Sequence, residues 1–333
     1  MTEIDYMIRA IELGAKYRGK TRPNPPVGAV IVSSGRIIAE GAHKVCGAAH
    51  AEAMAIKKAG SKAKGATIYV TLEPCSKAGR VGPCTEAIIK AGIKRVVYAC
   101  HDPNPVMKSR AKRILSNAGI KCECWQSSKD SQKREVASIA YRVLLKGFAK
   151  HVTTSLPYVT VKVAMSLDGR ICDINGASRW ISSKDTRAMT GKWREVVDVV
   201  LVGAGTLRAD NPSLLCHTKK NDSLWRAVVS SSGKLPKSAQ VFTDEAKDRT
   251  LVYRDAVEAI TDLGRRGFMH VLCEGGLKLA SSLAEAGLVD EWYTILAPIV
   301  IGSRPISNAV KFMPDTLIES SGDVVFSCLG DTK

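Results

Sequence analysis

The chain has 333 residues, more than one ordinary domain needs and about right for two. With 45% hydrophobic and 24% charged residues it does not have the composition of a disordered protein, and no apolar run approaches the roughly 20 residues that span a bilayer. The formal net charge of +17 is compatible with a nucleic acid, a phosphorylated substrate or cofactor, or merely solvated surfaces. Aromatic residues make up only 5% and do not alternate with the basic runs, so the pattern does not favour stacking of single-stranded bases.

The N-terminus and the spacing of the cysteines indicate in which cellular compartment the protein works. The first residues carry no basic region followed by an apolar core, so we expect no secretory signal. The ten cysteines are scattered along the chain without the spacing of a disulfide framework, which favours a reducing environment. We therefore expect a cytoplasmic protein that works on a small molecule, without a membrane or nucleic-acid partner.

The first half predicts two strands followed by alternating helices and strands. We expect, in chain order, a helix over 4–18, strands over 27–32 and 36–40, a helix from 50, a strand over 67–72, a helix over 83–92, a strand over 95–100, a helix over 106–117 and a strand over 120–124. This order predicts a three-layer α/β domain over residues 1–126. Residues 127–155 are expected to connect it to the second half of the chain, with a helix around 136–148.

One stretch of this half has the chemistry of a metal site. His50 opens a helix-forming run, Cys75 follows Glu73-Pro74, and Cys84 follows Pro83. One imidazole and two thiolates are ligands that zinc prefers, and three protein ligands leave the fourth position for water, as in catalytic sites. Glu52 is not needed as a ligand, and a carboxylate beside such a water can move its proton. His-x-Glu followed by Pro-Cys and a second cysteine is typical of zinc-dependent nucleobase deaminases.

The second half predicts another α/β domain over residues 156–333. Strands are expected over 159–164, 198–203, 227–231, 250–253 and 270–273, a helix over 277–286, and closing strands after 290 and over 323–329. Gly203-Ala-Gly205-Thr206 and Gly275-Gly276 lie at strand-to-helix junctions, where backbone amides can approach a phosphate. Each glycine pair by itself equally suits a tight turn. No Gly-x-Gly-x-x-Gly with an acidic residue at the expected distance is present, so a Rossmann fold is not predicted.

Several motifs of the first half resemble the deaminases of riboflavin biosynthesis. They are Asn24-Pro-Pro-Val-Gly28, Tyr69-Val-Thr-Leu-Glu-Pro-Cys75, Asp102-Pro-Asn-Pro105 and the eight-residue loop between Cys75 and Cys84. The resemblance implies a cytidine-deaminase-like fold with Zn2+ bound by His50, Cys75 and Cys84 and with Glu52 as the catalytic acid and base. It also implies substrate contacts from Asn24, His43, Lys77 and Arg80, of which the two cations suit a ribose phosphate.

The second half resembles the reductase domain of the same enzymes. The ordered set is Lys162-x-Ala164-x-Ser166-Leu-Asp168-Gly169, Ser178-x-Trp180-Ile, Arg194, Gly205-Thr206, Asp210-x-Pro212-x-Leu214, Glu274-Gly-Gly276 and Asp290-Glu291. The resemblance implies a dihydrofolate-reductase-like fold that uses NADPH. The implied substrate positions are Ser178, Arg194, Leu214, His217 and Glu274. The implied cofactor positions are Ala164, Trp180, Thr206, Asp210, Ser231, Gly276, Leu277, Lys278, Leu279, Ala280, Ser281 and Ser282.

Together the halves are similar to the bifunctional, RibD-type deaminase/reductase family of riboflavin biosynthesis. That resemblance implies deamination of 2,5-diamino-6-ribosylamino-4(3H)-pyrimidinone 5′-phosphate, followed by reduction of the ribosyl group to ribityl, in a homo-oligomer (dimer or tetramer). Three positions depart from the family pattern: Ser76-Lys-Ala78 replaces histidines, Val106 is followed by no glycine, and His217 replaces a phosphate-binding arginine. Because an imidazole is a poor substitute for a bidentate guanidinium, His217 predicts weaker substrate binding in the second step.

Two alternatives remain open at this point. The zinc motif and the positive charge also suit a deaminase acting on a nucleic-acid base, such as a tRNA adenosine deaminase, although that interpretation leaves residues 157–302 without a role. The other alternative is a family relative whose reductase domain is impaired, for which His217 is the motive.

Overall fold

The computed structural model describes residues 1–77, 82–105, 107, 109–176, 178, 181–216, 218, 222–303, 305, 310–311 and 324–329. The chain divides into two compact units, Met1–Ser155 and Leu156–Lys333. Among the described residues, no helix is both long enough and apolar enough to cross a bilayer.

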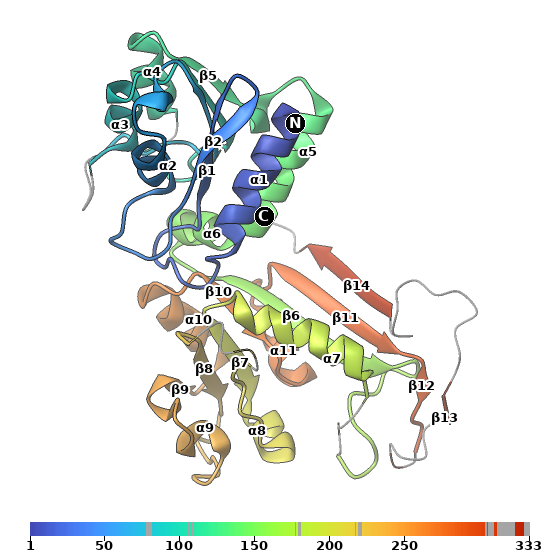
Figure 1. Ribbon diagram of the computed structural model, residues 1–333. Helices are drawn as coiled ribbons and strands as arrows, with labels where there is room; N and C mark the ends of the chain where they lie inside the picture. The colour runs from blue at the N-terminus through green and yellow to red at the C-terminus, as the bar shows by residue number, and fades with distance from the viewer. Residues whose placement is uncertain are drawn as a thin grey trace. The chain divides into compact units, whose positions relative to one another are not determined.

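The first unit is a five-stranded sheet between two helical layers. Its elements are α1 (Glu3–Ala15), β1 (Gly28–Ser33), β2 (Arg36–Ala42), α2 (Ala51–Ala59), β3 (Thr67–Leu72), α3 (Cys84–Lys90), β4 (Arg95–Cys100), α4 (Arg110–Asn117), β5 (Lys121–Cys124), α5 (Ser131–Ala140) and α6 (Lys146–Thr154), with short helical turns at Gly60–Ala63, Trp125–Ser127 and Tyr141–Leu145. The strand order is β2-β1-β3-β4-β5; β1 is antiparallel to both neighbours, and β3, β4 and β5 are parallel. Figure 1 shows α1 and α5 on one side of β1 and β2, with α2, α3 and α4 on the other.

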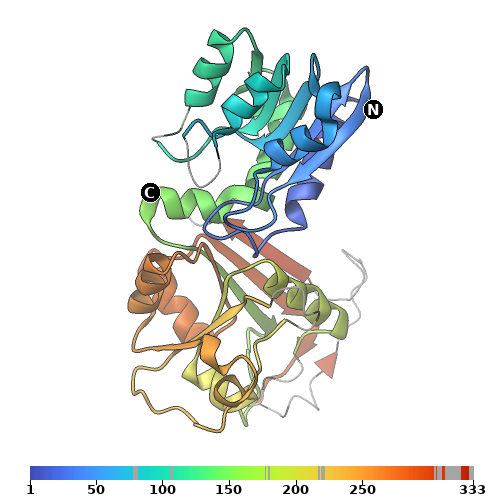
Figure 2. The same cartoon turned by 60° about the vertical axis from the view of Figure 1, so that its left-hand side comes forward.

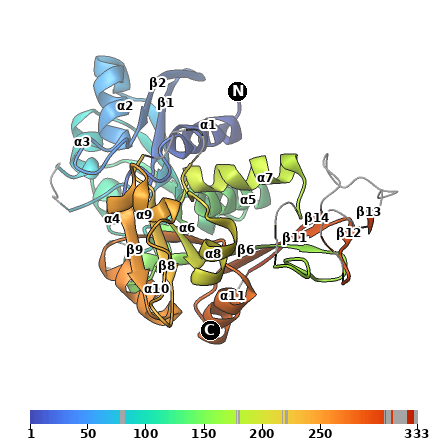
Figure 3. The same ribbon diagram turned by 90° about the horizontal axis from the view of Figure 1, so that it is seen from below.

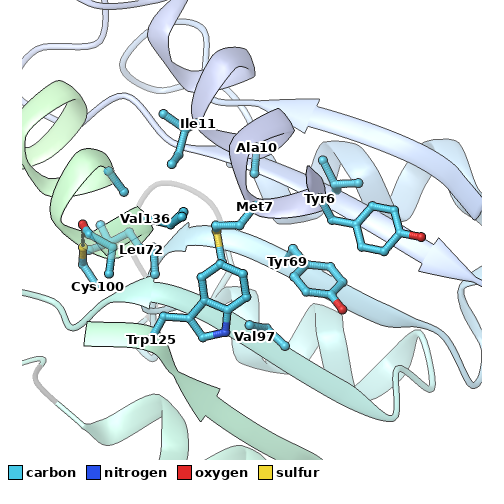
Figure 4. Close-up of a cluster of buried hydrophobic side chains, with 14 of the residues drawn as sticks. Tyr6, Met7, Ala10, Ile11, Tyr69, Leu72, Val97, Cys100, Trp125 and Val136 are labelled. Carbon is cyan, nitrogen blue, oxygen red and sulfur yellow. Dashed lines mark hydrogen bonds between the residues drawn. The ribbon is translucent and has the colours of Figure 1, made fainter. Parts of the chain in front are cut away.

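Each face of this sheet has its own core. On one face, side chains of α1 such as Met7 and Ile11 pack with Tyr69 and Val97 of the sheet and with the fully buried Trp125 (Figure 4). On the other face, alanines of α2 pack with Ile68 of β3 and with residues of α3 and α4. Because successive side chains of a strand point to opposite faces, the sheet contributes to both cores. The predicted three-layer architecture is confirmed.

Residues 127–155 differ from the predicted connection. We expected a helix around 136–148, whereas helical structure runs from Ser131 through the π-helical turn Tyr141–Leu145 to Thr154. Asp130 caps the start by accepting hydrogen bonds from the backbone amides of Gln132 and Lys133. The apolar face of this segment packs into the same core as α1, so it is an integral part of the first unit.

The second unit is a seven-stranded sheet covered on both faces. Its elements are β6 (Tyr158–Ser166), α7 (Lys184–Gly191), β7 (Val199–Gly203), α8 (Ala204–Asp210), β8 (Trp225–Val229), α9 (Gln240–Thr243), β9 (Thr250–Tyr253), α10 (Ala256–Arg265), β10 (His270–Cys273), α11 (Leu277–Glu285), β11 (Glu291–Ala297), β12 (Ile299–Val300), β13 (Val310–Lys311) and β14 (Val324–Leu329), with short turns at Lys192–Glu195 and Lys247–Arg249. The order is β14-β11-β6-β10-β7-β8-β9, in which β14 is the antiparallel strand.

The two faces of this second sheet carry different helices. α10 and α11 pack against one face, and Figure 2 shows these two orange helices together on one flank of the unit. Leu207 of α8 and Val241 of α9 pack against the other face. β9 and β14 are the edges of the sheet and lie on opposite sides of it in Figure 3. β10 lies between β6 and β7, so segments far apart in the sequence meet at the carboxyl ends of the parallel strands.

Candidate active sites

The three predicted metal ligands of the first unit come together. The Nδ1 atom of His50 lies 3.2 Å from the Sγ atom of Cys84 and 3.4 Å from that of Cys75. All three ligand atoms lie within 4.8 Å of one another, and they form the one such group of histidine, cysteine and acidic side chains found among the described residues. Such a cluster of one imidazole and two thiols has the size and donor set of a tetrahedral metal site with one position left over.

Local structure holds these ligands in place. His50 is the N-cap of α2, and Cys84 is the first residue of α3 after the N-cap Pro83. Cys75 lies just beyond the end of β3, where its carbonyl accepts a hydrogen bond from the amide of Thr85 and its Sγ accepts one from the amide of Cys84. The thiol and amide of Cys84, together with His50, outweigh burial and hold the pKa of Cys75 well below its usual range. A thiolate is therefore favoured at this position.

Glu52 lies in the first turn of α2 and is only 4% exposed. Burial, reinforced by the negative charge of Cys75, raises the pKa of its carboxyl group to about 7. A carboxyl group with that pKa can both accept and donate a proton near neutral pH, which a general acid and base requires.

Asn24 and His43 form a pair beside the metal ligands. His43 is 2% exposed, its ring packs edge-on against that of His50, and burial lowers its pKa. Its Nδ1 lies 3.3 Å from the carbonyl oxygen of Ala49, and its Nε2 lies 3.2 Å from the Nδ2 atom of Asn24. The neutral ring thus donates to Ala49 and accepts from the Asn24 amide group, which leaves the Asn24 Oδ1 for another partner. Lys77 is exposed, and Arg80 lies outside the described residues.

The second unit contains a cavity of about 1350 Å³ along the carboxyl ends of its parallel strands. Ligand sites in open α/β sheets lie in this position. The volume exceeds that of an ordinary single-ligand pocket of about 300–1,000 Å³, so there is room for two ligands together.

A charged cluster lies at the β6 and β10 end of this cavity. Glu274, just after β10, accepts two hydrogen bonds from Arg194, at 2.7 Å from Nε and 3.1 Å from Nη2, and Lys162 Nζ of β6 lies 3.6 Å from its carboxylate. The side chain of Glu274 is 12% exposed. Burial alone would raise its pKa, but the two cations outweigh burial and lower it to about 2, so the carboxylate stays ionised.

Most residues with implied reductase roles line this cavity. The lining includes Ala164, Ser178, Arg194, Thr206, Asp210, Leu214, Ser231, Glu274, Gly276, Leu277, Lys278, Leu279 and Ser282. Ser178 donates a hydrogen bond of 2.7 Å to Asp210. Ala280 instead packs in the core, and Ser281 is exposed and is not among the lining residues. Trp180 and His217 lie outside the described residues.

The comparisons with known proteins identify both halves. The sequence model of the cytidine and deoxycytidylate deaminase zinc-binding region matches residues 1–100, and that of the RibD C-terminal domain matches residues 157–314. The riboflavin biosynthesis protein RibD of Bacillus amyloliquefaciens is 39% identical over 326 residues, covering 89% of this chain and 85% of that relative. RibD of Aquifex aeolicus is 36% identical, covering 90% of this chain and 88% of its own. The chain belongs to the RibD family.

Solved RibD structures have the same fold. Acinetobacter baumannii RibD (form 1) superposes with a TM-score of 0.81 at 33% identity over 99% of each chain. A diaminohydroxyphosphoribosylaminopyrimidine deaminase/5-amino-6-(5-phosphoribosylamino)uracil reductase from Thermotoga maritima gives a TM-score of 0.83 at 33% identity over 98% of each. This RibD-family chain is thus a riboflavin biosynthesis enzyme with a deaminase half followed by a reductase half, as its motifs predicted.

Sequence reasoning missed some residues of this RibD-family chain. The sequence motif contains Glu73 but assigns it no role. In the structure its buried carboxylate accepts hydrogen bonds from the amides of Asp102, Ser109 and Ala111, so it connects the Cys75 loop to the start of α4. The motif also contains Lys162 without assigning it a role. A single lysine within an otherwise apolar strand is the sequence feature that could have indicated a functional side chain there. Three arginines that line the cavity, Arg187, Arg208 and Arg254, belong to no sequence motif, so only the folded second unit shows that they face the same cavity.

Proposed function

We propose that the chain catalyses two consecutive steps of riboflavin biosynthesis. The first is hydrolytic deamination of 2,5-diamino-6-ribosylamino-4(3H)-pyrimidinone 5′-phosphate at the His50, Cys75 and Cys84 cluster. The second is NADPH-dependent reduction of the ribosyl group to ribityl in the cavity of the second unit. The observation that carries the proposal is the metal-ligand cluster with a buried proton-transfer carboxyl group, Glu52, in a chain of the RibD family.

Zinc suits the first site by its donor set. Two thiols and one imidazole favour zinc over magnesium or calcium, which prefer oxygen ligands. His50, Cys75 and Cys84 would hold the zinc, which when bound would supply the Lewis acidity that makes water a nucleophile near neutral pH. The carboxyl group of Glu52, with its pKa of about 7, would accept a proton from the attacking water and donate one to the departing amino group.

The groups around the zinc ligands orient the pyrimidine. His43 fixes the amide of Asn24, so that the Asn24 Oδ1 is left to accept a hydrogen bond from a ring N–H or amino group. Lys77 and Arg80 supply cations for the ribose phosphate.

The charged cluster of the second unit binds the deaminated product. An ionised Glu274 accepts hydrogen bonds from N–H groups of the ring, and Arg194 and Lys162 keep it ionised. Ser178, Leu214 and His217 complete the substrate positions by resemblance to the family. His217 would hold the phosphate less firmly than an arginine.

A dinucleotide suits the remainder of the cavity. NADPH, when bound, supplies the hydride for the second step. The residues after β7 and β10 come close together, because a Cβ on Gly275 would lie 3.1 Å from the backbone N of Gly203 and 2.8 Å from Leu279 Cδ2. A Cβ on Gly205 would meet no atom within 4 Å, and one on Gly276 would meet only two side-chain atoms at 3.9 Å, so the backbone at both cavity-lining positions has space in which a pyrophosphate can approach.

Location, assembly and the alternatives follow from the same proposal. We place the enzyme in the cytoplasm as a dimer or tetramer, working on a phosphorylated pyrimidine. A deaminase of nucleic-acid bases is not favoured, because the RibD relatives match over about nine-tenths of the chain, reductase half included.

A coupled assay tests the proposal. The purified protein should contain one zinc per chain, release ammonia from the diaminopyrimidine nucleotide without NADPH, and consume NADPH only once deaminated product is present. Release of ammonia from tRNA but not from the free nucleotide would refute the first step. Oxidation of NADPH absent under every condition would restrict the function to deamination.

A further inference from the structure

The loop after α8 contains a leucine in a strained backbone conformation. Asn211 ends α8, and the residues from Asn211 to Leu214 line the cavity of the second unit. Leu214 has a φ of +59°, a left-handed conformation that is costly for a residue with a Cβ and that persists only where the surrounding structure imposes it. Its side chain is 2% exposed and packs in the hydrophobic core. Contacts on either side of Leu214 must therefore hold the loop in this conformation.

Two guanidinium groups hold the carbonyls that flank Leu214. The Nη1 atom of Arg226 donates to the carbonyl of Ser213 at 2.9 Å, and the Nη1 atom of Arg194 donates to the carbonyl of Leu215 at 3.2 Å. Arg194 lines the cavity, whereas Arg226 belongs to β8, and its side chain is completely buried. The strained residue thus lies between one anchor in the cavity and one anchor in the core.

Arg226 has no donor left for a ligand. Its Nε atom donates to Oγ1 of Thr250 at 3.0 Å, its Nη1 atom also donates to Asp244 at 2.6 Å, and its Nη2 atom donates at 2.9 Å both to Asp244 and to the carbonyl of Val241. With the bond to Ser213, all five N–H groups of the guanidinium are engaged. Such a group cannot bind a substrate, but its rigid planar fork can fix the loop relative to α9 and β9.

The support behind the loop is itself connected. The Oδ1 atom of Asn211 accepts a hydrogen bond of 2.8 Å from the backbone amide of Gln240, which is the first residue of α9. The hydroxyl of Thr250 donates at 2.8 Å to the carbonyl of Val241, so the start of β9 is joined to α9 as well. The loop is therefore fastened at Asn211 and at Ser213 to one hydrogen-bonded unit.

The loop in turn contacts the charged cluster of the cavity. The guanidinium of Arg194 that holds the Leu215 carbonyl also donates through Nε and Nη2 to Glu274. If Leu214 relaxed to a negative φ, the peptide groups on both sides of it would turn, and the Leu215 carbonyl would leave Arg194. The wall formed by Leu214 and the orientation of Arg194 would then change together.

We propose that Arg226 is a positioning residue of the reductase site, which holds Leu214 in its left-handed conformation and thereby sets the orientation of Arg194 toward the substrate. The inference rests on the proposed reductase function and adds to it a residue that does not line the cavity. Because Arg226 contacts no reacting group, its loss should weaken substrate binding and leave turnover of bound substrate nearly intact. The implied cofactor positions on α8 and α11 are not among its contacts, so NADPH binding should be spared.

Steady-state kinetics of the reductase step on R226K test the inference. Lysine keeps the charge opposite Asp244 but has no fork, so it cannot hold Asp244 and the Ser213 carbonyl together. We expect KM for the deaminated nucleotide to rise about tenfold, with kcat and the NADPH affinity measured by fluorescence each within about threefold of wild type. D244N, which keeps the arginine but removes its charged partner, should raise KM by a smaller factor. Deamination should be unchanged in both variants.

Two comparisons separate positioning from a general loss of stability. D198N removes a buried carboxylate that accepts hydrogen bonds from the amides of Met269 and His270 at the amino end of β10, away from the cavity lining. It should lower the urea midpoint without raising KM. L214G removes the strain, because glycine adopts a positive φ readily. In the L214G background R226K should therefore change KM by less than about threefold, whereas an arginine that only stabilises the fold would raise KM equally in both backgrounds.

The other outcomes overturn the inference in distinguishable ways. If the wild type reduces the nucleotide and KM is unchanged in R226K and D244N, the inference fails and the reductase function stands. If kcat and NADPH affinity fall along with substrate affinity, or if D198N raises KM as much as R226K does, Arg226 supports the whole unit and the inference also fails. Should R226K not fold, the KM of D244N decides. If the wild type does not reduce the nucleotide with NADPH, the proposed function fails together with the inference.

Discussion

The two candidate sites of this chain differ in how their functional residues are distributed. The metal cluster of the proposed deaminase site comes from one stretch, His50 to Cys84, and its three ligand atoms lie within 4.8 Å of one another. Cys84 and Glu52 are buried, whereas His50 and Cys75 are partly exposed. The reductase site is a long cavity with contributions from the ends of five parallel strands, and its polar groups are spread along it. In the proposed function, the first arrangement would concentrate one reaction at a single metal ion, and the volume of the second leaves room for two large ligands.

This difference predicts how each site responds to damage. A compact cluster depends on every member, because each ligand has no substitute. A distributed cavity loses binding contacts one at a time, so single substitutions there should be graded in effect. Substitutions at the two sites therefore test the contrast directly.

Cys84→Ala should have the largest effect. With one of three protein ligands removed, we expect zinc content to fall from about one per chain to near zero after dialysis, and deamination to be abolished. Reduction of pre-formed deaminated product should continue. Metal analysis beside separate assays of the two steps measures this, with Cys122→Ala as a matched control because the Cys122 thiol lies outside the cluster and contacts the Ile120 carbonyl. Retention of zinc in Cys84→Ala would refute the ligand assignment.

Glu52→Gln should come next. The amide cannot move a proton, so we expect ammonia release to fall by about 10²–10⁴-fold with zinc content unchanged. Glu86→Gln on the exposed side of α3 should leave the rate unaltered. Full activity of Glu52→Gln would mean that another group transfers the proton.

The compact site was also the more predictable one. Its ligands follow from local spacing, since a helix start, a strand end and a second helix start suffice to bring His50, Cys75 and Cys84 together. Lys162 and Arg254 could not be found in this way. Lys162 meets Glu274 because β10 pairs with β6, and Arg254 reaches the cavity because β9 pairs with β8. Local periodicity contains neither pairing.

The fold shows the same limit. Strands 67–72, 95–100, 250–253 and 270–273 begin and end as predicted, because short, nearly continuous apolar runs between breakers define them. The segment 131–154 was predicted too short and in the wrong role, since which core its apolar face joins is decided by α1 and the sheet. α10 was overlooked, although Asp255 caps it and Ile260 and Leu263 lie on one face.

Glu274→Gln tests the charged cluster in the cavity of the second unit, where one carboxylate contacts both Arg194 and Lys162. The substitution removes the carboxylate that Arg194 and Lys162 share in a mostly buried place, so we expect the second unit to lose about 3–5 kcal/mol of unfolding free energy at neutral pH. Reductase activity should fall, and deamination should persist. Urea unfolding measures the loss, and the exposed Arg265→Gln should stay within about 0.5 kcal/mol of wild type.

The pH dependence of that loss supplies a second check. The pKa of Glu274 is lowered from 4.5 to about 2, so the stabilisation by its charge is complete above the ordinary value and is lost as the pH falls toward 2. The difference between wild type and Glu274→Gln should therefore shrink as the pH is lowered below about 4.5. A difference that stays constant down to about pH 3 would assign the loss to packing.

His217→Arg should have the smallest effect and the opposite sign. A guanidinium can bind the substrate phosphate through two parallel hydrogen bonds, a geometry that an imidazole cannot offer, so we expect KM for the reductase step to fall several-fold with kcat nearly unchanged. Steady-state kinetics on the deaminated nucleotide measure this, and the dephosphorylated nucleoside is the control, because its KM should not respond to the substitution. If KM for the nucleotide does not fall, other cations of the cavity already hold the phosphate, and the departure at 217 costs this reductase nothing. A several-fold fall in KM would instead show that substrate binding in the long cavity can be strengthened by one added contact. The metal cluster, in which every ligand is already required, does not offer this possibility.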